Sequence, residues 1–187
     1  MNIRQLSFSI IFSALFVAAL SSCSTDTVVS DAQRKANEDA LYLEFLSQKY
    51  DYYVNTLHIP EPGFRKDTVD LVYWETKAGI GSNITSGQVV GFRYKLYSLE
   101  LDSLGIKVNT VLQTDSYTSS FPTLLQVDAS TSTNGYVTTP GLYRAMKLMK
   151  NGGKANILMP SSLGDFAVTG YSSSYYEVEI VYVSRPQ

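Results

Sequence analysis

Few residues in this sequence can do covalent or metal chemistry, because the reactive side chains occur singly. Cys23 is the one cysteine and His58 the one histidine among 187 residues. A His-based triad or a metal site of His and Cys therefore has nothing to assemble from, and we expect no metal and no other cofactor. Glu177 and Glu179 lie two apart and share one strand face, which a solvated surface explains better than paired acid–base chemistry. No nucleophile with a base in reach can be proposed.

Cys23 is a candidate for lipid attachment. A start that carries Arg4 precedes the apolar run from Leu6 to Leu20, which is followed by Ser21-Ser22-Cys23. A charged start, a short apolar stretch and small residues before a cut site are typical of a secretory signal, and the run is shorter than the roughly 20 residues that span a bilayer. The segment resembles the bacterial lipobox, which implies cleavage before Cys23 and acylation of its thiol and amine. The alternative is an ordinary signal peptide followed by a buried thiol.

The lipobox resemblance predicts where the protein resides. Residues 1–22 are expected to be a lipoprotein signal peptide and residues 23–30 a lipid-anchored linker. The protein is then held in the bacterial cell envelope by its lipid, facing the periplasm or the outer surface. The net charge is −2 and no basic tract is present, so nucleic acid is not an expected partner.

An amphipathic helix is predicted over residues 31–57, with Ser30 or Asp31 as its N-terminal cap. Its apolar residues recur at spacings of three and four: Ala32, Ala36, Ala40, Leu43, Leu46, Tyr50, Tyr53 and Leu57. Such a helix buries one face, either on its own domain or on a second copy in a homodimer, and the pattern leaves this choice open. Pro60 and Pro62 then predict a Pro-rich hinge over residues 58–68, in which His58 is a plain linker residue.

Residues 69–187 are predicted to form an α+β domain of strands around one short helix. The composition is rich in Tyr, Val, Thr and Ser, which favours strands. The helix begins near Pro140, where a missing amide does no harm, and ends before Gly152. Trp74 is expected to pack in the sheet rather than to stack on a ligand. Strands are expected at 69–75, 88–96, 106–112, 124–127, 154–159 and 175–183.

The order of these segments resembles the FKBP-type peptidyl-prolyl isomerases. Residues 141–163, GLYRAMKLMKNGGKANILMPSSL, are similar to the family pattern G-W-x-x-A-L-x-x-M-x-x-G-x-K-A/W-x-x-x-I-P-x-x-L-A-Y. The terminal Tyr175-Tyr176-Glu177-Val178-Glu179-Ile180 is similar to the family's last strand, and Gly87-Gln88-Val89-Val90-Gly91-Phe92 to its G-x-x-V-x-V-x-Y. The resemblance spans about Val69 to Ser184. It implies a half-barrel of antiparallel strands wrapped around the helix, with a prolyl-binding cleft between helix and sheet.

The resemblance also implies a set of pocket positions, most of them altered. The family's floor tryptophan falls on Leu142, its second-strand tyrosine on Phe92, and its last-strand phenylalanine on Tyr176. The aromatic–Asp pair after the first hairpin falls on Val108 and Asn109. The Val–Ile pair before the helix falls on Thr138 and Thr139, of which Thr139 still offers its backbone amide, and the tyrosine of L-A-Y falls on Asp165.

Two functions of different classes are compatible with this pattern. The first is a membrane-anchored FKBP-type isomerase of low activity, with a degenerate prolyl pocket, that assists the folding of exported proteins. The second is a catalytically inactive FKBP-like module that binds peptides or proteins. In either case the expected partners are X-Pro peptides or exported client proteins.

Overall fold

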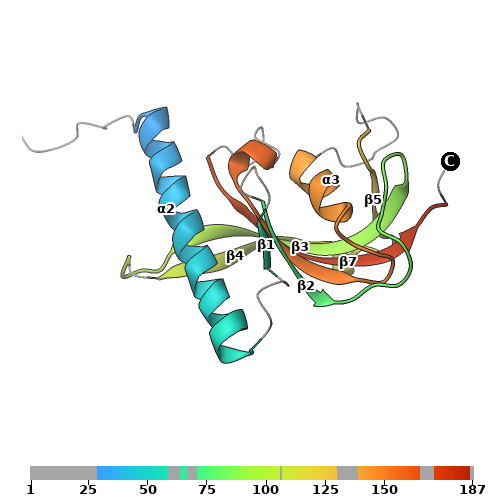
Figure 1. Cartoon of the computed structure of the whole chain (residues 1–187). Coiled ribbons are helices and arrows are strands. Elements are labelled where there is room, and N and C mark those ends of the chain that lie inside the picture. The colour runs from blue at the N-terminus through green and yellow to red at the C-terminus, as the bar shows by residue number, and fades with distance from the viewer. Residues whose placement is uncertain are drawn as a thin grey trace, which may run out of the picture. The chain divides into compact units, whose positions relative to one another are not determined.

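One antiparallel sheet carries the fold. In the computed structural model of this chain the described residues are 29–58, 64–66, 71–105, 107–129, 139–164 and 171–185. By its contacts the chain divides after Gln33, and the sheet, helix α3 and most of helix α2 belong to the second unit, Arg34–Gln187. Within the described residues, the strands run in the order β1-β2-β6-β7-β3-β4, and β5 pairs with β3 (Figure 1).

The predicted elements are present, with shifted ends. Helix α2 is Asp31–Tyr50, continued by a π-helical turn at Asp51–Thr56, and α3 is Pro140–Met146. Ser30 caps α2, since its Oγ accepts from the amide of Gln33 at 3.2 Å. The strands are β1 Phe64–Lys66, β2 Val72–Lys77, β3 Val89–Leu101, β4 Val108–Asp115, β5 Thr123–Gln126, β6 Lys154–Met159 and β7 Ser174–Val183. The hinge predicted over 58–68 is wrong at residues 64–66, because β1 pairs with the edge of β2 there.

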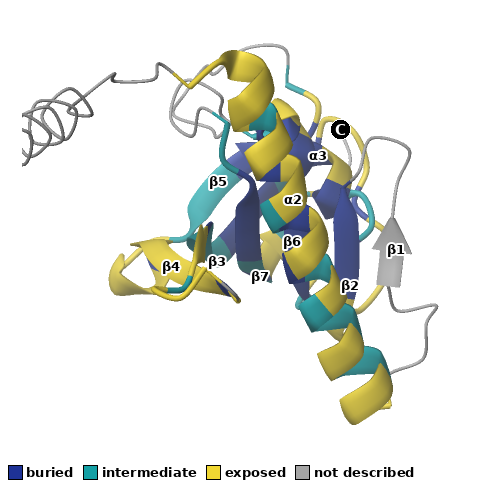
Figure 2. Ribbon diagram, turned by 90° about the vertical axis from the view of Figure 1, so that its left-hand side faces the viewer, coloured by how far each residue is buried: buried dark blue, intermediate teal, exposed yellow. Residues whose placement is uncertain are grey.

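Both faces of the sheet bury apolar side chains, because successive residues of a strand point to opposite faces. On one face the α3-side cluster includes Val90, Phe92, Leu142, Ile157, Tyr176 and Val178. On the other, the α2-side cluster comprises Tyr42, Phe45, Val72, Trp74, Leu99, Val108, Leu158 and Tyr175. In Figure 2, α2 is exposed on its outer side and lies in front of the buried strands. The sheet is therefore covered by one helix on each face.

The buried face of α2 differs in part from the predicted one, although Leu46 and Tyr53 of the predicted face do pack against the α2-side cluster. Glu38, Tyr42 and Phe45 are its buried residues, whereas Ala36 and Ala40 are exposed and Leu43 is 59% exposed. Burial of large aromatic rings removes more apolar surface from water than burial of alanines, so the helix turns Tyr42 and Phe45 toward the sheet. Phe45 packs edge-on against Tyr175 with ring centroids 5.1 Å apart. The helix packs on its own domain.

The segment after the short helix and strands β6 and β7 supply deeply buried side chains to the α3-side cluster. Met149, Ala155, Ile157, Val178 and Ile180 are each at most 2% exposed. Leu148 is the exception, since it is only partly buried against this cluster. Trp74 is 1% exposed and stacks on Tyr175 at 5.9 Å, which confirms the prediction that it packs in the sheet.

Candidate prolyl-binding site

Helix α3 is short and almost wholly enclosed. It begins at Pro140, whose missing amide is harmless at a first helical position, after Thr139 in an extended conformation. Gly141, Leu142, Tyr143, Ala145 and Met146 are all buried. A Cβ at position 141 would lie 2.6 Å from Met159 Sδ and 3.0 Å from the carbonyl oxygen of Leu163. Glycine at this position therefore lets α3 start in contact with the end of β6.

An aromatic group lines the sheet face that α3 covers. The rings of Phe92 and Tyr94 are 5.5 Å apart, and those of Tyr94 and Tyr176 are 5.7 Å apart. Phe92 is fully buried and Tyr176 is 8% exposed, whereas Tyr94 is partly exposed. Burial raises the pKa of the Tyr94 phenol, so this hydroxyl is neutral at physiological pH. Tyr94 is thus the member of the group that keeps an accessible surface.

A cavity of about 390 Å³ is lined by Leu96, which follows Tyr94 by two residues on β3. Its lining combines Leu96, which packs on the α3-side cluster, and Tyr97, which packs on the α2-side cluster, with the polar residues Ser98, Gln113, Thr114 and Ser172–Ser174. Leu96 pairs with Tyr176 in β7 and with Thr114 in β4, and the β3–β4 register shifts immediately afterward. Such a bulge bends a strand and redirects its side chains. The cavity volume lies within the roughly 300–1,000 Å³ range of ligand pockets.

Comparison with known proteins identifies the fold. No family model and no curated protein matches this chain. Solved structures do match. FkpA from Escherichia coli is 20% identical with a TM-score of 0.51, covering 98% of this chain and 74% of that chain. This is an FKBP-like domain.

Two further structures carry the same fold. A peptidyl-prolyl cis-trans isomerase from Pseudomonas syringae pv. tomato is 16% identical with a TM-score of 0.56. The match covers 87% of this chain and 100% of that chain. The N-terminal domain of FKBP42 from Arabidopsis thaliana is 16% identical with a TM-score of 0.50. The match covers 65% of this chain and 93% of that chain. At these identities the likeness establishes the FKBP-like fold.

The FKBP-like domain brings three of the expected pocket residues together. Phe92, Leu142 and Tyr176 all belong to the α3-side cluster. Leu142 is 2% exposed and Phe92 is fully buried, so these two side chains are packed into the core rather than lining the cavity. Thr139 is 8% exposed and its carbonyl accepts from the Tyr143 amide at 3.2 Å.

The aromatic–Asp position is not where the sequence placed it. Val108 is buried in the α2-side cluster, on the opposite face of the sheet, and Asn109 is exposed. The physical reason is the length of the β3–β4 hairpin, whose pairing continues to Lys95↔Asp115. At the other end of this pairing, Asp115 forms an ion pair with Lys95 at 3.8 Å on the face of the sheet opposite α3. Thr138, Asp165 and the lipidation candidate Cys23 lie outside the described residues.

Sequence reasoning missed Tyr94, although the signal was present. Counted from Gly87, the family pattern G-x-x-V-x-V-x-Y places its final tyrosine on Tyr94 and an apolar position on Phe92. The structure agrees with this spacing, since Phe92 is core and Tyr94 reaches the surface. Tyr94, rather than Phe92, is the aromatic residue available to a ligand.

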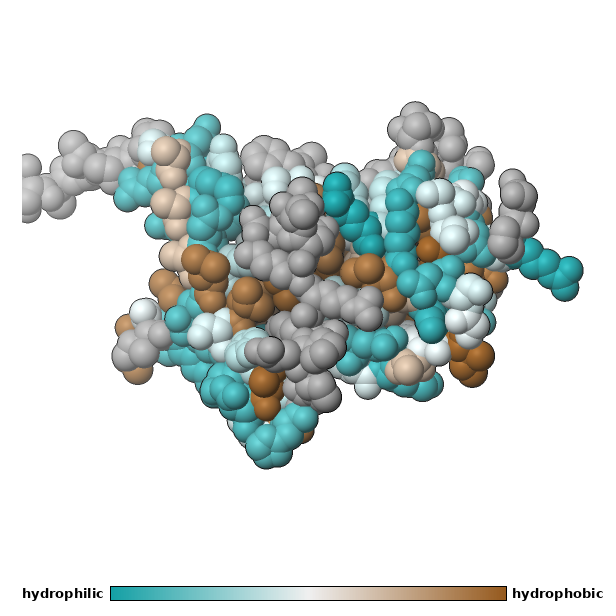
Figure 3. Space-filling view, in the orientation of Figure 1, coloured by the Kyte–Doolittle hydropathy of each residue, from teal (hydrophilic) through white to brown (hydrophobic). Residues whose placement is uncertain are grey.

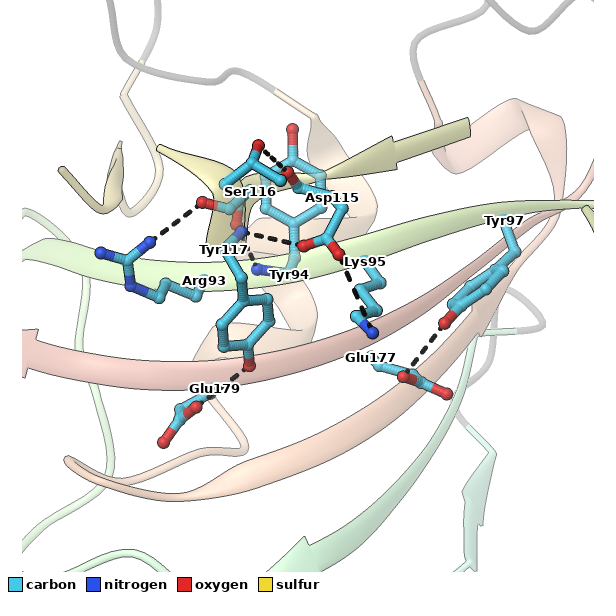
Figure 4. Close-up of polar contacts among 10 residues, drawn as sticks. Arg93, Tyr94, Lys95, Tyr97, Asp115, Ser116, Tyr117, Glu177 and Glu179 are labelled. Atoms are coloured by element: carbon cyan, nitrogen blue, oxygen red, sulfur yellow. Dashed lines mark hydrogen bonds and ion pairs between the residues drawn. The ribbon is translucent and has the colours of Figure 1, made fainter. Parts of the chain in front are cut away.

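The opposite face of the sheet carries a group of polar side chains (Figure 4). Tyr117 Oη donates to Glu179 at 3.0 Å, and Tyr97 Oη donates to Glu177 at 3.2 Å. Lys154 pairs with Glu179 at 3.1 Å. Burial alone would raise the pKa of Glu179, but the hydrogen bonds from Lys154 and Tyr117 lower it overall. These contacts agree with the interpretation of Glu177 and Glu179 as a partly solvated strand face.

Proposed function

We propose that this protein is an FKBP-type peptidyl-prolyl isomerase of low activity that assists the folding of exported proteins. The observation that carries the proposal is the Tyr94–Tyr176 ring pair on the α3 side of an FKBP-like fold, with a cavity lined by Leu96, two residues after Tyr94 on β3. A proline ring is apolar and flat-sided, so an aromatic pair with an adjoining apolar residue such as Leu96 suits it. The ligand class is therefore an X-Pro peptide segment.

The reaction needs no nucleophile, which suits a site built from aromatic and hydroxyl groups. The X-Pro amide rotates through a twisted form over a barrier of roughly 18–20 kcal/mol. A water-poor pocket binds the twisted amide better than the planar, more polarised one, and such differential binding lowers the barrier. In this proposal Tyr94 and Tyr176 hold the proline ring, and the Thr139 amide donates to the substrate carbonyl.

Low activity is expected because the floor of the site is altered. Leu142 stands at the position of the family's tryptophan and is 2% exposed, so it offers a ligand little surface. Val108 and Asn109 contribute nothing on the α3 side. These departures favour the alternative, an FKBP-like module that binds proline-containing segments of client proteins without turning them over.

An isomerisation assay on short proline peptides separates the two functions. With the purified protein, we expect a rate above the uncatalysed one, and we expect Tyr94→Ala to reduce it about tenfold or more, since a lost aromatic contact removes part of the transition-state binding. Tyr52→Ala is the matched control, because Tyr52 is 49% exposed on the π-helical turn after α2. A wild-type rate equal to the uncatalysed rate, with peptide binding that is lost in Tyr94→Ala, would leave the binding module.

The envelope location is part of the proposal. None of the described helices is long and apolar enough to cross a membrane. We infer that the protein is tethered through lipid on Cys23, because the chain's one cysteine directly follows a short apolar run and Leu20-Ser21-Ser22. Client proteins would then meet the FKBP-like domain after export.

A second copy of the chain is a further proposed partner. The outward side of α2 exposes Ala36, Ala40 and Leu43, and Figure 3 shows apolar side chains around the middle of α2 and near the hairpin beside it. We expect concentration-dependent dimerisation in analytical ultracentrifugation, weakened by Leu43→Glu because the charge would face the partner helix. Glu44→Gln is the control on the same helix, and a monomer at every concentration would remove this partner.

A further inference from the structure

The least expected residue of α2 is a buried glutamate. Glu38 is 2% exposed overall, and its side chain is completely enclosed. Burial of a carboxylate is costly unless hydrogen bonds or opposite charges compensate it. A helix that only covered an apolar sheet would place an apolar residue at this position. The partners of Glu38 therefore indicate what the helix does.

Three hydrogen bonds from two segments converge on the Glu38 carboxylate. Its Oε1 accepts from the Ser161 amide at 2.5 Å and from Ser173 Oγ at 2.9 Å. Its Oε2 accepts from Ser161 Oγ at 2.8 Å. Lys35, one turn earlier on α2, adds an ion pair at 3.4 Å. Hydrogen bonds to a charged acceptor are stronger than neutral ones, so one carboxylate holds Ser161 and Ser173 together.

Both segments held by Glu38 adjoin the candidate site. Ser161 opens the 3-10 turn Ser161–Leu163 after β6, and the Leu163 carbonyl of this turn lies against Gly141 at the start of α3. Ser173 directly precedes β7 and lines the cavity together with Leu96. Glu38 is thus joined to one segment that supports α3 and to one that forms the cavity wall.

We propose that Glu38 is a positioning residue for the prolyl-binding site, and that the docked helix α2 helps to maintain the geometry of that site. Glu38 fixes Ser173 in the cavity wall and fixes the Ser161 turn against α3, so the geometry offered to a peptide depends on α2 being docked. The peptide class rests on the proposed function, whereas the positioning rests on the hydrogen bonds alone. Any partner that moves α2 would then change peptide affinity at a cavity it does not touch.

The test compares peptide affinity in variants of the full-length protein. Glu38→Ala is expected to weaken binding of a fluorescent X-Pro peptide about tenfold, because charge-assisted hydrogen bonds that set the cavity wall are lost. Glu38→Gln should give a smaller loss, since its amide oxygen can still accept. Glu44→Ala is the control, because Glu44 is exposed on α2 and bonds only locally with Gln48 in the described structure.

A double-mutant cycle distinguishes positioning from simple helix docking. Ser173→Ala removes one donor without touching α2, so its effect on peptide affinity should not add to that of Glu38→Ala. Additive effects would overturn the proposal. So would an unchanged affinity in Glu38→Ala with a lowered melting temperature, since Glu38 would then only dock the helix. If Glu38→Ala does not fold, Glu38→Gln and Ser173→Ala supply the same cycle.

Hydrogen exchange makes the outcome independent of the proposed function. In Glu38→Ala the amides of Ser161 and of residues 171–173 should lose protection, while the β3–β7 amides keep theirs. If the wild type binds no proline peptide, the proposed function fails while this loss of protection still supports positioning by Glu38. Unchanged protection at both segments would overturn the positioning role, whatever the peptide result.

Discussion

At the scale of single residues, the polar face of the sheet is organised around Tyr117. Its ring lies 5.9 Å from the Arg93 guanidinium carbon, and its hydroxyl donates to Glu179. Asp115 caps the 3-10 turn Ser116–Thr118 by accepting from the Tyr117 amide at 2.9 Å. A charge on the Tyr117 oxygen would face the Glu179 carboxylate. Ionisation of Tyr117 is therefore opposed by the fold.

We predict an alkaline loss of stability that depends on Tyr117. Burial and the neighbouring Glu179 raise the pKa of Tyr117 to about 12, from an ordinary value of 10.0. As the pH rises, the unfolded chain ionises first, so the stabilisation is complete below pH 10.0 and is lost toward about 12. Urea unfolding across this range should show a shallower decline in Tyr117→Phe than in wild type. Tyr52→Phe is the control, and identical slopes for Tyr117→Phe and wild type would contradict the prediction.

At the scale of elements, the strands that lie between α2 on one face and α3 on the other contain continuous runs of apolar residues. Leu71-Val72-Tyr73-Trp74 and Ile157-Leu158-Met159 are buried at every position, whereas a strand with one solvated face would alternate. Ile157 and Met159 face the α3-side cluster and Leu158 faces the α2-side cluster. These runs are what two helices on opposite faces require.

We predict that strand β6 is sensitive to truncation at its inward positions. Ile157 is fully buried, so Ile157→Ala should lower the free energy of unfolding by about 2–5 kcal/mol, through lost transfer energy and the cavity left behind. Val181→Ala on β7 is the matched control, since Val181 is 47% exposed and surface changes usually stay within about 0.5 kcal/mol. Urea melts measure both. Equal stabilities of Ile157→Ala and wild type would exclude this packing.

At the scale of the whole molecule, helix α2 lies in the sequence between the proposed membrane tether and the FKBP-like domain. Because Glu38, Tyr42 and Phe45 dock α2 on the domain, the helix belongs to the folded body from Arg34 onward. In this proposal, residues 23–30 link Cys23 to the start of α2 in the sequence. Such a tether would keep the cavity close to the membrane surface.

We predict that this tether depends on Cys23. Cys23→Ser should move the protein from the membrane fraction to the soluble fraction, or leave its precursor unprocessed, because several acyl chains anchor stably where a single one does not. Fractionation followed by intact-mass measurement tests this, with Ser24→Ala as the control. An unmodified Cys23 thiol in the wild-type protein would rule out the lipid anchor.

The sequence alone determined the elements and the fold class. Glycine and proline at positions 140–153, the apolar runs of β2 and β6 and the alternation in β7 place helix and strands within a few residues, because these signals are local. The same sequence places Tyr94 at the tyrosine of the family pattern, seven residues after Gly87.

Only the tertiary structure decided which faces and which distant residues meet. Val108 and Asn109 depended on where a long hairpin closes, and that is set by cross-strand register, which local spacing does not encode. The face that α2 buries depended on the packing of Tyr42 and Phe45 against the sheet. Their partners there include Trp74 and Tyr175. The periodicity of the sequence places Glu38 on the surface. Its hydrogen-bond donors, Ser161 and Ser173, are 123 and 135 residues away in the sequence, so local patterns do not reveal them. Long-range burial and hydrogen bonding therefore determined which face of α2 packs on the sheet. They also determined that Glu38, on this face, is the residue proposed to position the site.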